Sequence, residues 1–420
     1  MTTFAAWPSG YAQAHGSPNA QTIKTFSNST NVTKSDTGTA ATHTYDAASP
    51  FGATRLRVDC PAGNTNTEVQ IHTGLSVAKW PDGETIAFRL WFDDWQKVAD
   101  VQLYAGTASY TRYLQRNLTV QSSNVNNRNG PITFDLNSHI TSVNTFTYGS
   151  DTLASVKIRV VPKSGEACRF WVDSFSIAPK SRPCVIITFD DASDTWVDTA
   201  APYLLTNNML ATFGVGTEQI GTNDSTYCTA AELLTLQVAG HDVQVHNVTN
   251  TSFASSGLKA YMAEYDAAAA QLRTWGITNP FIYHPFVQGL YDQTALDALA
   301  RRGVKVMRGV DSASATTCRI NQPSAGTYTD NIVNLKIGNH GASLSLAQAT
   351  TNITNLLKYG GTYVAMFHDI VPSGATGVET NEADFTGFID LLARHRAAGL
   401  LDVMKVSDWY QGLTQPQVVS

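Results

Sequence analysis

Two adjacent carboxylates follow a run of apolar residues in the second half of the chain. The run is Cys184-Val-Ile-Ile-Thr-Phe189, and Asp190 and Asp191 come directly after it. Continuous apolar runs are typical of strands buried on both faces of a parallel sheet, and catalytic groups gather at the carboxyl ends of such strands. Since paired acids are costly there, we expect one to bind a metal ion and the other to accept a proton. The alternative is an Asx-turn or a helix N-cap.

Histidines follow in the same half. His246 and Asn250 stand four residues apart, so a helical turn would place both side chains on one face. Imidazole suits zinc and other divalent ions, whereas asparagine offers a neutral oxygen. His368 ends the apolar run Thr362–Phe367, and a histidine that titrates near neutrality suits a general acid. For each histidine taken alone, a packed or surface position is the commoner outcome.

A second Phe-Asp-Asp triplet occurs in the first half of the chain, at Phe92-Asp93-Asp94. It follows an alternating segment, is flanked by Trp91 and Trp95, and has no histidines nearby in sequence. We therefore predict that it forms an exposed turn.

The elements that position these residues differ between the two halves. Residues 1–180 carry period-two alternation, which predicts half-buried antiparallel strands. The clearest segments are Glu68–His72, Thr85–Trp91, Ser155–Val160 and Arg169–Ile177. Many short strands without helices indicate an all-β sandwich of jelly-roll type. The prolines of 179–183 then predict a linker.

Residues 181–420 alternate apolar strands with amphipathic helices, which indicates an α/β domain with a barrel-like closed sheet. The predicted helices are Asp198–Asn208, Thr229–Val238, Leu258–Trp275, Thr294–Arg302, Leu346–Tyr359 and Asp384–Ala398. Further strands are predicted at Ala211–Val215, Val304–Met307, Thr362–Phe367 and Leu401–Met404.

Composition excludes several classes of protein. The 420 residues carry a net charge of −6 and show no basic cluster, which argues against a nucleic-acid partner. No apolar run is long enough for a membrane span.

We expect an extracellular, surface or virion-associated protein. Since the first residues show no classical signal peptide, that location requires either export by another route or a leader that has been removed. The five scattered cysteines predict neither a disulfide framework nor a structural zinc site. Nothing predicts the oligomeric state.

The order of the motifs across roughly residues 184–412 resembles the polysaccharide deacetylase family of NodB type, which is similar to carbohydrate esterase family 4. The resemblance implies a distorted (β/α) barrel and hydrolysis of N- or O-linked acetyl groups. It is carried by Thr188–Asp191, Ala211–Phe213, Gly240–Asp242 leading into His246, a Pro-aromatic pair, a strand that ends in His368, and the closing segment Gly399–Asp408.

Carried over residue by residue, the resemblance implies that Asp190 is the general base and Asp191 a metal ligand. His246 matches a ligand histidine, and His368 matches the histidine that protonates the leaving group. One divalent ion is implied, with zinc expected. The implied substrate is an acetylated polysaccharide of capsule, cell-wall or exopolysaccharide type.

Three positions depart from the family pattern. Asn250 replaces the second ligand histidine, which implies a weaker metal ligand. Tyr283-His284 stands where the family has an arginine, so that Asp190 is either tuned differently or helped by Arg308. Pro285-Phe286 resembles the groove wall, where the Phe286 N–H would help to hold an oxyanion. After this pair, Val287-Gln288 replaces the family's glycine, and His284 is either packed or a ligand or substrate contact. We expect His241 and Asp242 to be structural.

Three hypotheses follow from the sequence. The first is an active deacetylase with a carbohydrate-binding or adaptor domain in front, in which Trp80, Trp91 and Trp95 either stack on sugars or fill the core. The second is a carbohydrate-binding protein with a decayed site. The third is a receptor-binding or tail component that uses the fold as a scaffold. The joint presence of the base, ligands and acid favours the first.

Overall fold

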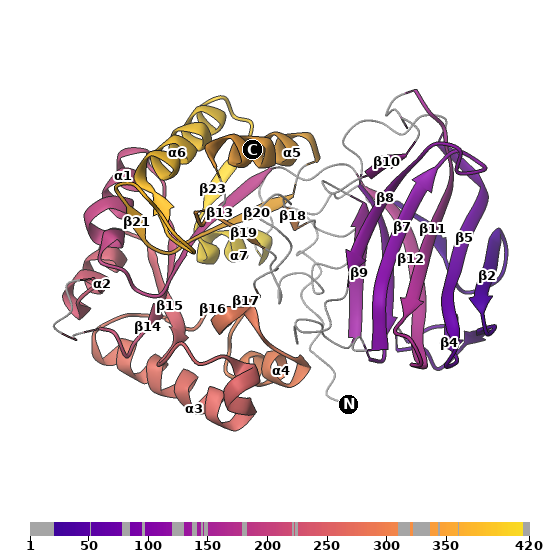
Figure 1. The fold of residues 1–420 in the computed structure, drawn as a ribbon, viewed down its shortest axis with the longest axis horizontal. Coiled ribbons are helices and arrows are strands. Elements are labelled where there is room, and N and C mark those ends of the chain that lie inside the picture. The colour runs from indigo at the N-terminus through magenta and orange to yellow at the C-terminus, as the bar shows by residue number, and fades with distance from the viewer. Residues whose placement is uncertain are drawn as a thin grey trace. The chain divides into compact units, whose positions relative to one another are not determined.

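The computed structural model describes residues 21–50, 52–77, 85–94, 97–119, 130–136, 141–143, 146, 150–178, 183–220, 222, 226–309, 320–321, 337–342, 345–359 and 361–414. The described residues from 21 to 178 form one compact unit, and those from 183 to 414 form a second (Figure 1). Of the predicted linker, residues 179–182 lie outside the described residues.

The first unit consists of two antiparallel sheets, each with six strands among the described residues. One sheet has the order β3-β4-β12-β6-β9, with β1 also pairing with β12; the other has the order β10-β8-β7-β11-β5-β2. The bounds of the first are β1 (Gln21–Thr25), β3 (Thr42–Asp46), β4 (Arg55–Cys60), β6 (Thr85–Phe92), β9 (Gly130–Leu136) and β12 (Cys168–Ala178). Those of the second are β2 (Val32–Gly38), β5 (Asn64–Val77), β7 (Val98–Gly106), β8 (Tyr113–Thr119), β10 (Thr141–Val143) and β11 (Leu153–Pro162).

Alternation of apolar and polar residues produces the core of this unit. In β4 the buried residues alternate with half-buried ones, because successive side chains of a strand point to opposite faces. Buried side chains of both sheets, such as Phe88 and Ile158, belong to one hydrophobic cluster. The all-β prediction is therefore confirmed, whereas the jelly-roll arrangement stays a prediction. Trp91 is half-buried, and Trp80 and Trp95 lie outside the described residues.

The second unit is built on a seven-stranded sheet with the order β15-β14-β13-β20-β18, to which β19 and β23 add at β20 and β13. All pairs are parallel except β18 with β20. The strands are β13 (Cys184–Asp190), β14 (Thr212–Gly216), β15 (Asp242–Asn247), β18 (Ile320–Asn321), β19 (Ile337–Asn339), β20 (Thr362–Phe367) and β23 (Asp402–Met404). Two small parallel sheets pair β16 (Tyr283–Pro285) with β17 (Val306–Arg308), and β21 (Ile370–Val371) with β22 (Thr380–Asn381).

Helices follow most of these strands. They are η3 (Trp196–Ala200), α1 (Ala201–Thr206), α2 (Ala230–Val238), α3 (Phe253–Thr274), η4 (Val287–Gly289), α4 (Gln293–Arg301), α5 (Leu346–Tyr359), α6 (Glu382–Ala397) and α7 (Val406–Thr414). The predicted alternation of strand and helix is confirmed. Among the described strands no single closed sheet forms, so the barrel stays a prediction.

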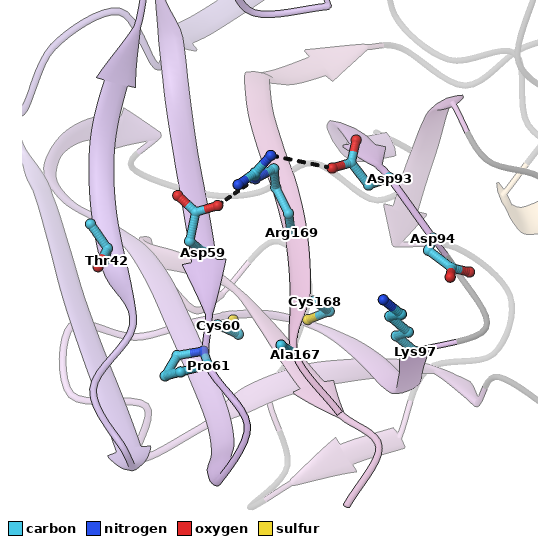
Figure 2. Close-up of a pocket in the computed structure, with 10 residues that line it drawn as sticks. All are labelled: Thr42, Asp59, Cys60, Pro61, Asp93, Asp94, Lys97, Ala167, Cys168 and Arg169. Carbon is cyan, nitrogen blue, oxygen red and sulfur yellow. Dashed lines mark hydrogen bonds and ion pairs between the residues drawn. The ribbon is translucent and has the colours of Figure 1, made fainter. Parts of the chain in front are cut away.

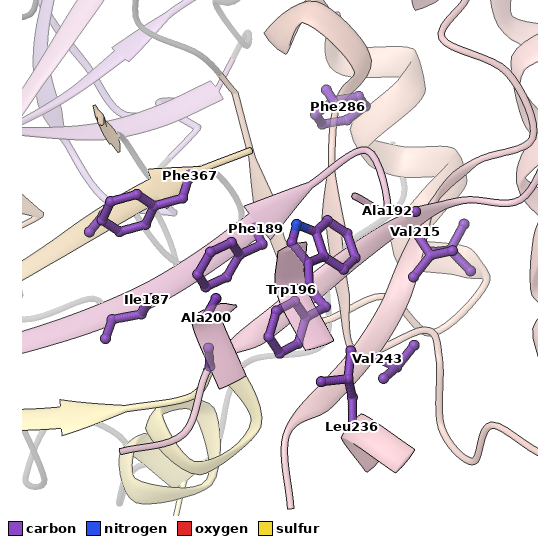
Figure 3. Close-up of a cluster of buried hydrophobic side chains, with 14 of the residues drawn as sticks. Ile187, Phe189, Ala192, Trp196, Ala200, Val215, Leu236, Val243, Phe286 and Phe367 are labelled. Carbon is purple, nitrogen blue, oxygen red and sulfur yellow. The ribbon is translucent and has the colours of Figure 1, made fainter. Parts of the chain in front are cut away.

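An aromatic cluster underlies the carboxyl ends of the central strands (Figure 3). The ring of Phe189 stacks on Phe213 at 4.9 Å and on Phe367 at 5.4 Å between centroids, so that β13 is joined to both neighbouring strands. Trp196 packs 5.0 Å from Phe213. Such ring contacts add to the stability that burial gives, and they hold the residues after Phe189 and Phe367 at fixed positions.

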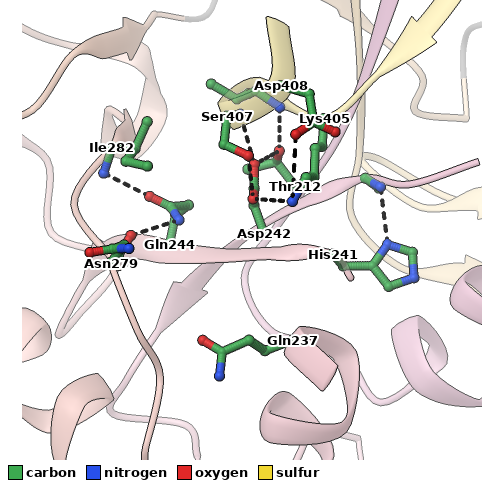
Figure 4. A network of polar contacts seen from close by, with 12 residues as sticks. Thr212, Gln237, His241, Asp242, Gln244, Asn279, Ile282, Lys405, Ser407 and Asp408 are labelled. Atoms are coloured by element: carbon green, nitrogen blue, oxygen red, sulfur yellow. Dashed lines mark hydrogen bonds and ion pairs between the residues drawn. The ribbon is translucent and has the colours of Figure 1, made fainter. Parts of the chain in front are cut away.

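Polar side chains join β15 to segments with which it does not form a regular ladder (Figure 4). The Gln244 Oε1 accepts hydrogen bonds from the N–H groups of Ile282 and Tyr283, at 2.9 and 3.0 Å. The Asp242 carboxylate accepts from Ser407 and pairs with Lys405. Since buried backbone groups need partners, Gln244 connects β15 to the segment that leads into β16.

No helix in the described part of the chain combines the length and the apolar character that a membrane crossing requires.

Three buried histidines predict that the second unit loses stability in mild acid. Burial lowers the pKa of His241 to about 4, and that of His284 and His340 to about 3, from an ordinary value of 6.5. These groups are neutral in the folded protein but become protonated in the unfolded chain as pH falls below 6.5. Their contribution to the stability of the second unit is therefore fully present above pH 6.5 and is lost as pH falls towards 4. We expect the urea midpoint to fall between pH 7 and pH 5, and His340→Leu to make this dependence shallower. An unchanged midpoint would contradict the assignment.

Candidate active site

The end of β13 directs two neighbouring carboxylates to different partners. Asp190 is the last residue of the strand, and Asp191 and Ala192 follow with φ angles of 81° and 70°. Non-glycine residues in this left-handed region cost about 1–3 kcal/mol each and are concentrated at functional sites. The Asp191 N–H donates to the Gly214 carbonyl at 3.2 Å, which anchors the turn. The alternative of a helix N-cap does not hold for Asp191, since the next helix begins at Trp196 and Thr195 is its N-cap.

Asp190 forms a fully buried ion pair with Arg308. The guanidinium Nη2 donates to Asp190 Oδ2, while Arg308 Nε donates to the Tyr283 hydroxyl at 2.7 Å and Nη1 to the Met366 sulfur at 2.8 Å. Burial alone would lower the pKa of Arg308, but the charges of Asp190 and Tyr283 raise it, so the guanidinium stays cationic. The other carboxylate oxygen, Asp190 Oδ1, is buried without a hydrogen-bond partner among the described residues.

Asp191 lies between two histidines. Its Oδ1 is 3.4 Å from His246 Nε2, and its Oδ2 is 3.8 Å from His368 Nε2. Burial alone would raise the pKa of Asp191, but the hydrogen bond and charge of His246, with the charges of His368 and Arg308, lower it to about 2. The predicted grouping of Asp191 with these two histidines is therefore what the structure contains.

His246 lies in a strand, so the predicted helical turn from His246 to Asn250 is wrong. Val243 and Val245 pair with β14, and this sheet pairing outweighs the four-residue spacing that suggested a helix. The His246 Nδ1 donates to the Pro285 carbonyl at 2.9 Å, which directs Nε2 towards Asp191. Asn250 is exposed in the bend after β15, and no hydrogen bond links it to Asp191 or His246.

Asp191 and His246 fit a divalent cation as two of its ligands. A carboxylate oxygen and an imidazole nitrogen held by a carbonyl on its other side are a common donor pair for zinc. Burial acts to lower the pKa of His246, but the charges of Asp190 and Asp191 outweigh it and raise that pKa. The same negative charges that favour a proton on Nε2 would favour a cation there, which would take the place of that proton. Among the described residues, no group of three or more His, Cys, Asp or Glu side chains forms a complete set.

His368 is held through its backbone and its neighbour. The Trp196 indole donates to the His368 carbonyl at 3.0 Å, and Asp369 accepts hydrogen bonds from Ser193 and Thr195 at 2.8 and 2.7 Å. Burial lowers the pKa of His368 against the opposing charges of Asp190 and Asp191. Its Nδ1 has no hydrogen-bond partner in the part of the chain that the structure describes. None of these anchoring residues was predicted, although Asp369 directly follows His368.

Three of the residues predicted to line a groove are buried in the structure. Tyr283, His284 and Phe286 are all buried, with 0–1% of their surface exposed. His284 bonds to the Tyr261 hydroxyl at 3.0 Å and to the Val245 carbonyl at 3.1 Å, so of the two alternatives it is the packed one that the structure shows. The Phe286 N–H donates to the Arg308 carbonyl at 2.8 Å, so the oxyanion role predicted for it is also wrong. Pro285 contributes its carbonyl to His246.

The arrangement supplies the groups that a hydrolysis needs. Asp190 Oδ1 can accept a proton from water, and the His368 imidazole can carry one to a leaving group. Asp191 and His246 can hold a cation that polarises a carbonyl. All four residues stand at or beside the carboxyl ends of β13, β15 and β20, which is where ligands bind in α/β sheets.

Comparisons with known proteins place the sequence beside carbohydrate-active hydrolases. Residues 178–307 match the family model described as polysaccharide deacetylase. The sequence matches no curated protein.

Several solved structures are similar in part. A family 4 acetyl xylan esterase from Clostridium thermocellum, in complex with a cobalt ion, is 19% identical, with a TM-score of 0.38 over 54% of this chain and 90% of that one. The Bc1960 peptidoglycan N-acetylglucosamine deacetylase is 12% identical, with a TM-score of 0.40 over 56% and 90%. A family 4 carbohydrate esterase from Streptomyces lividans, in complex with acetate, is 15% identical, with a TM-score of 0.35 over 52% and 90%. Likenesses of this size carry no argument about activity.

The family match covers β13, β14, β15 and β16, and therefore includes Asp190, Asp191 and His246, whereas Arg308 lies one residue beyond its end. It ends before His368, which the structure brings to the same site. The chain therefore contains a domain of the polysaccharide deacetylase family, matched over residues 178–307.

Proposed function

We propose that the second unit is a metal-dependent hydrolase that removes acetyl groups from a polysaccharide. The observation that carries this proposal is the different environment of the two adjacent carboxylates. Asp190 is paired with Arg308 and keeps one oxygen without a partner, whereas Asp191 lies between two imidazoles. One acid is thereby suited to accept a proton and the other to bind a cation.

The chain's own groups account for the proton transfers. Asp190 Oδ1 takes a proton from water as the water oxygen adds to the acetyl carbonyl carbon. The bond to the sugar nitrogen or oxygen then breaks, and His368 supplies the proton that the leaving atom needs, so that acetate and a free amine or hydroxyl result. Burial lowers the pKa of His368, which makes its protonated form the stronger acid.

A cation held by Asp191 and His246 would supply polarisation of the acetyl carbonyl and of the attacking water. We take zinc as the ion, because a nitrogen and oxygen donor pair suits it. Asn250 remains our candidate for a further ligand, after movement of the bend that holds it.

Arg308 takes the place of the arginine that is missing before Pro285. It lies on β17, in register with Pro285 on β16, and reaches Asp190 from there. A fixed guanidinium on Oδ2 leaves Oδ1 as the oxygen that accepts the proton. We therefore propose that Arg308 positions the base.

The substrate belongs to the acetylated polysaccharides, and we propose an extracellular or surface location for the reaction. The first unit would then be a carbohydrate-binding or adaptor domain. The test is acetate release from N- and O-acetylated polysaccharides, with and without a chelator. Release that the chelator stops supports the proposal. Glycan binding without release would instead support the carbohydrate-binding hypothesis.

Gly214 gives a prediction about the space beside the base. A Cβ at this position would lie 2.8 Å from Pro285 Cγ and 3.3 Å from Asp190 Oδ1. We expect Gly214→Ala to cost about 1–3 kcal/mol of stability through overpacking, and to lower the rate of acetate release further than this loss explains. Gly216→Ala on the same strand is the control, since its Cβ would meet only Gln219 Oε1 at 3.5 Å. Equal activity of the two variants would contradict the assignment of Asp190.

A further inference from the structure

Two cysteines stand opposite each other at the end of a strand pair in the first unit. Cys60 is the last residue of β4, Cys168 is the first residue of β12, and the antiparallel register pairs them directly. Directly opposed Cβ atoms lie roughly 4.5–5.5 Å apart, and a disulfide needs roughly 3.5–4.5 Å. The pairing of β4 with β12 ends at these two residues, so the β4–β12 ladder does not hold the backbone beyond them. A small movement there would bring the two Cβ atoms to the distance that a disulfide needs.

A pocket opens onto the pair (Figure 2). Its volume is about 370 Å³, and its lining includes Cys60, Cys168, Asp93, Asp94, Lys97 and Arg169. The two cysteines are buried, with 2% and 6% of their surface exposed, but both belong to the wall of this pocket. A small reagent that carries both charge signs therefore has a route to the sulfurs.

The two thiols are not equivalent. The interaction between the two side chains raises the pKa of Cys60 and lowers that of Cys168. The Lys97 ammonium adds to the lowering at Cys168, against the effect of burial. Because the thiolate is the nucleophile in thiol–disulfide exchange, Cys168 is the residue that reacts first and Cys60 the one that follows.

We propose that Cys60 and Cys168 form a redox-sensitive pair that small disulfides of the glutathione type convert to an intramolecular disulfide. In the first step the Cys168 thiolate attacks one sulfur of the small disulfide, forms a mixed disulfide and releases one small thiolate, which takes a proton from water. In the second step Cys60 loses its proton and attacks the Cys168 sulfur, and the second small thiol leaves. The protein loses two hydrogens, and the small disulfide is reduced to two thiols.

The other described cysteines lack this arrangement. Cys184 pairs in the sheet with Thr362 and Asp402, and the Cys228 thiol donates to the Ser193 carbonyl at 3.0 Å. Cys318 lies outside the described residues. The proposed link is therefore specific to one strand pair, where it would tie β4 to β12 across about 108 residues of chain.

The test exposes the reduced full-length protein to oxidised glutathione under native conditions. Remaining thiols are then alkylated after unfolding and mapped by mass spectrometry. We expect three of the five cysteines to be alkylated, a linked peptide that contains Cys60 and Cys168, and a melting temperature of the first unit raised by at least about 5 °C. Cys228→Ser, the control, should give the same linked peptide.

Two variants separate the roles of the sulfurs. Cys60→Ser should retain one glutathione on Cys168, and Cys168→Ser should leave Cys60 alkylated and without glutathione. Five alkylated cysteines in the wild-type protein, or a link between other cysteines, would overturn the proposal. The wild-type map decides this even if a variant does not fold.

Discussion

Replacing Arg308 with methionine should lower the free energy of unfolding of the second unit by about 3–5 kcal/mol. Methionine keeps much of the side-chain length but removes the charge that pairs with Asp190. Both partners are almost fully buried, with side-chain exposures of 0% and 4%. The loss is large because it leaves a buried carboxylate without a counter-charge, and it is measured by urea unfolding of the variant and the wild-type protein.

The control is Arg302→Met. Arg302 pairs with Asp266 at 2.7 Å, but the side-chain exposures are 32% and 55%. Solvent screens such a pair, so we expect a loss below about 1 kcal/mol. The double variant Arg308→Met with Asp190→Leu should recover part of the stability, because the buried charge is then absent. Equal losses for the two arginine variants would show that the Arg308 pair is not buried as described.

Replacing Asp190 with asparagine should lower the rate of acetate release by about 10²–10⁴-fold. The amide cannot accept the proton of the attacking water, although it has nearly the same shape. The variant also leaves Arg308 without a charged partner, so its fold has to be confirmed by circular dichroism at the assay temperature before the rate is interpreted.

Asp93→Asn is the matched control for this variant. Asp93 stands in the Phe92-Asp93-Asp94 triplet, directly after β6, where it is exposed and 3.8 Å from Arg169. This triplet has the same three residue types as Phe189-Asp190-Asp191, but none of its residues belongs to the candidate active site. We expect its acetate release to equal that of the wild-type protein. A folded Asp190→Asn variant with unchanged release would exclude Asp190 as the base.

The sequence predicts the position of the site because parallel strands end at one edge of a sheet. The apolar runs before Asp190 and His368 predict two neighbouring strands, β13 and β20, and the structure pairs them in register from Cys184 to Phe189. Both acids and His368 therefore had to lie near each other. The exposed turn at Asp93 was predicted for a different reason: the triplet follows an alternating segment and has no histidines nearby in sequence.

The details of the site depend on contacts that no spacing reveals. His246 and Asn250 are four apart, which is compatible with a helix, but the pairing of Val243 and Val245 with β14 makes the segment a strand. Arg308 reaches Asp190 across 118 residues of sequence. The Phe286 N–H seemed free because its partner, the Arg308 carbonyl, belongs to a strand of three residues.

Acetate release by metal-stripped and zinc-loaded protein tests the account most directly. Zinc should restore release to stripped wild-type protein on at least one acetylated polysaccharide, and His246→Ala should stay inactive at the same zinc concentration. Wild-type protein that releases no acetate from any N- or O-acetylated polysaccharide, and that retains no zinc after loading, would contradict the assignment of this site.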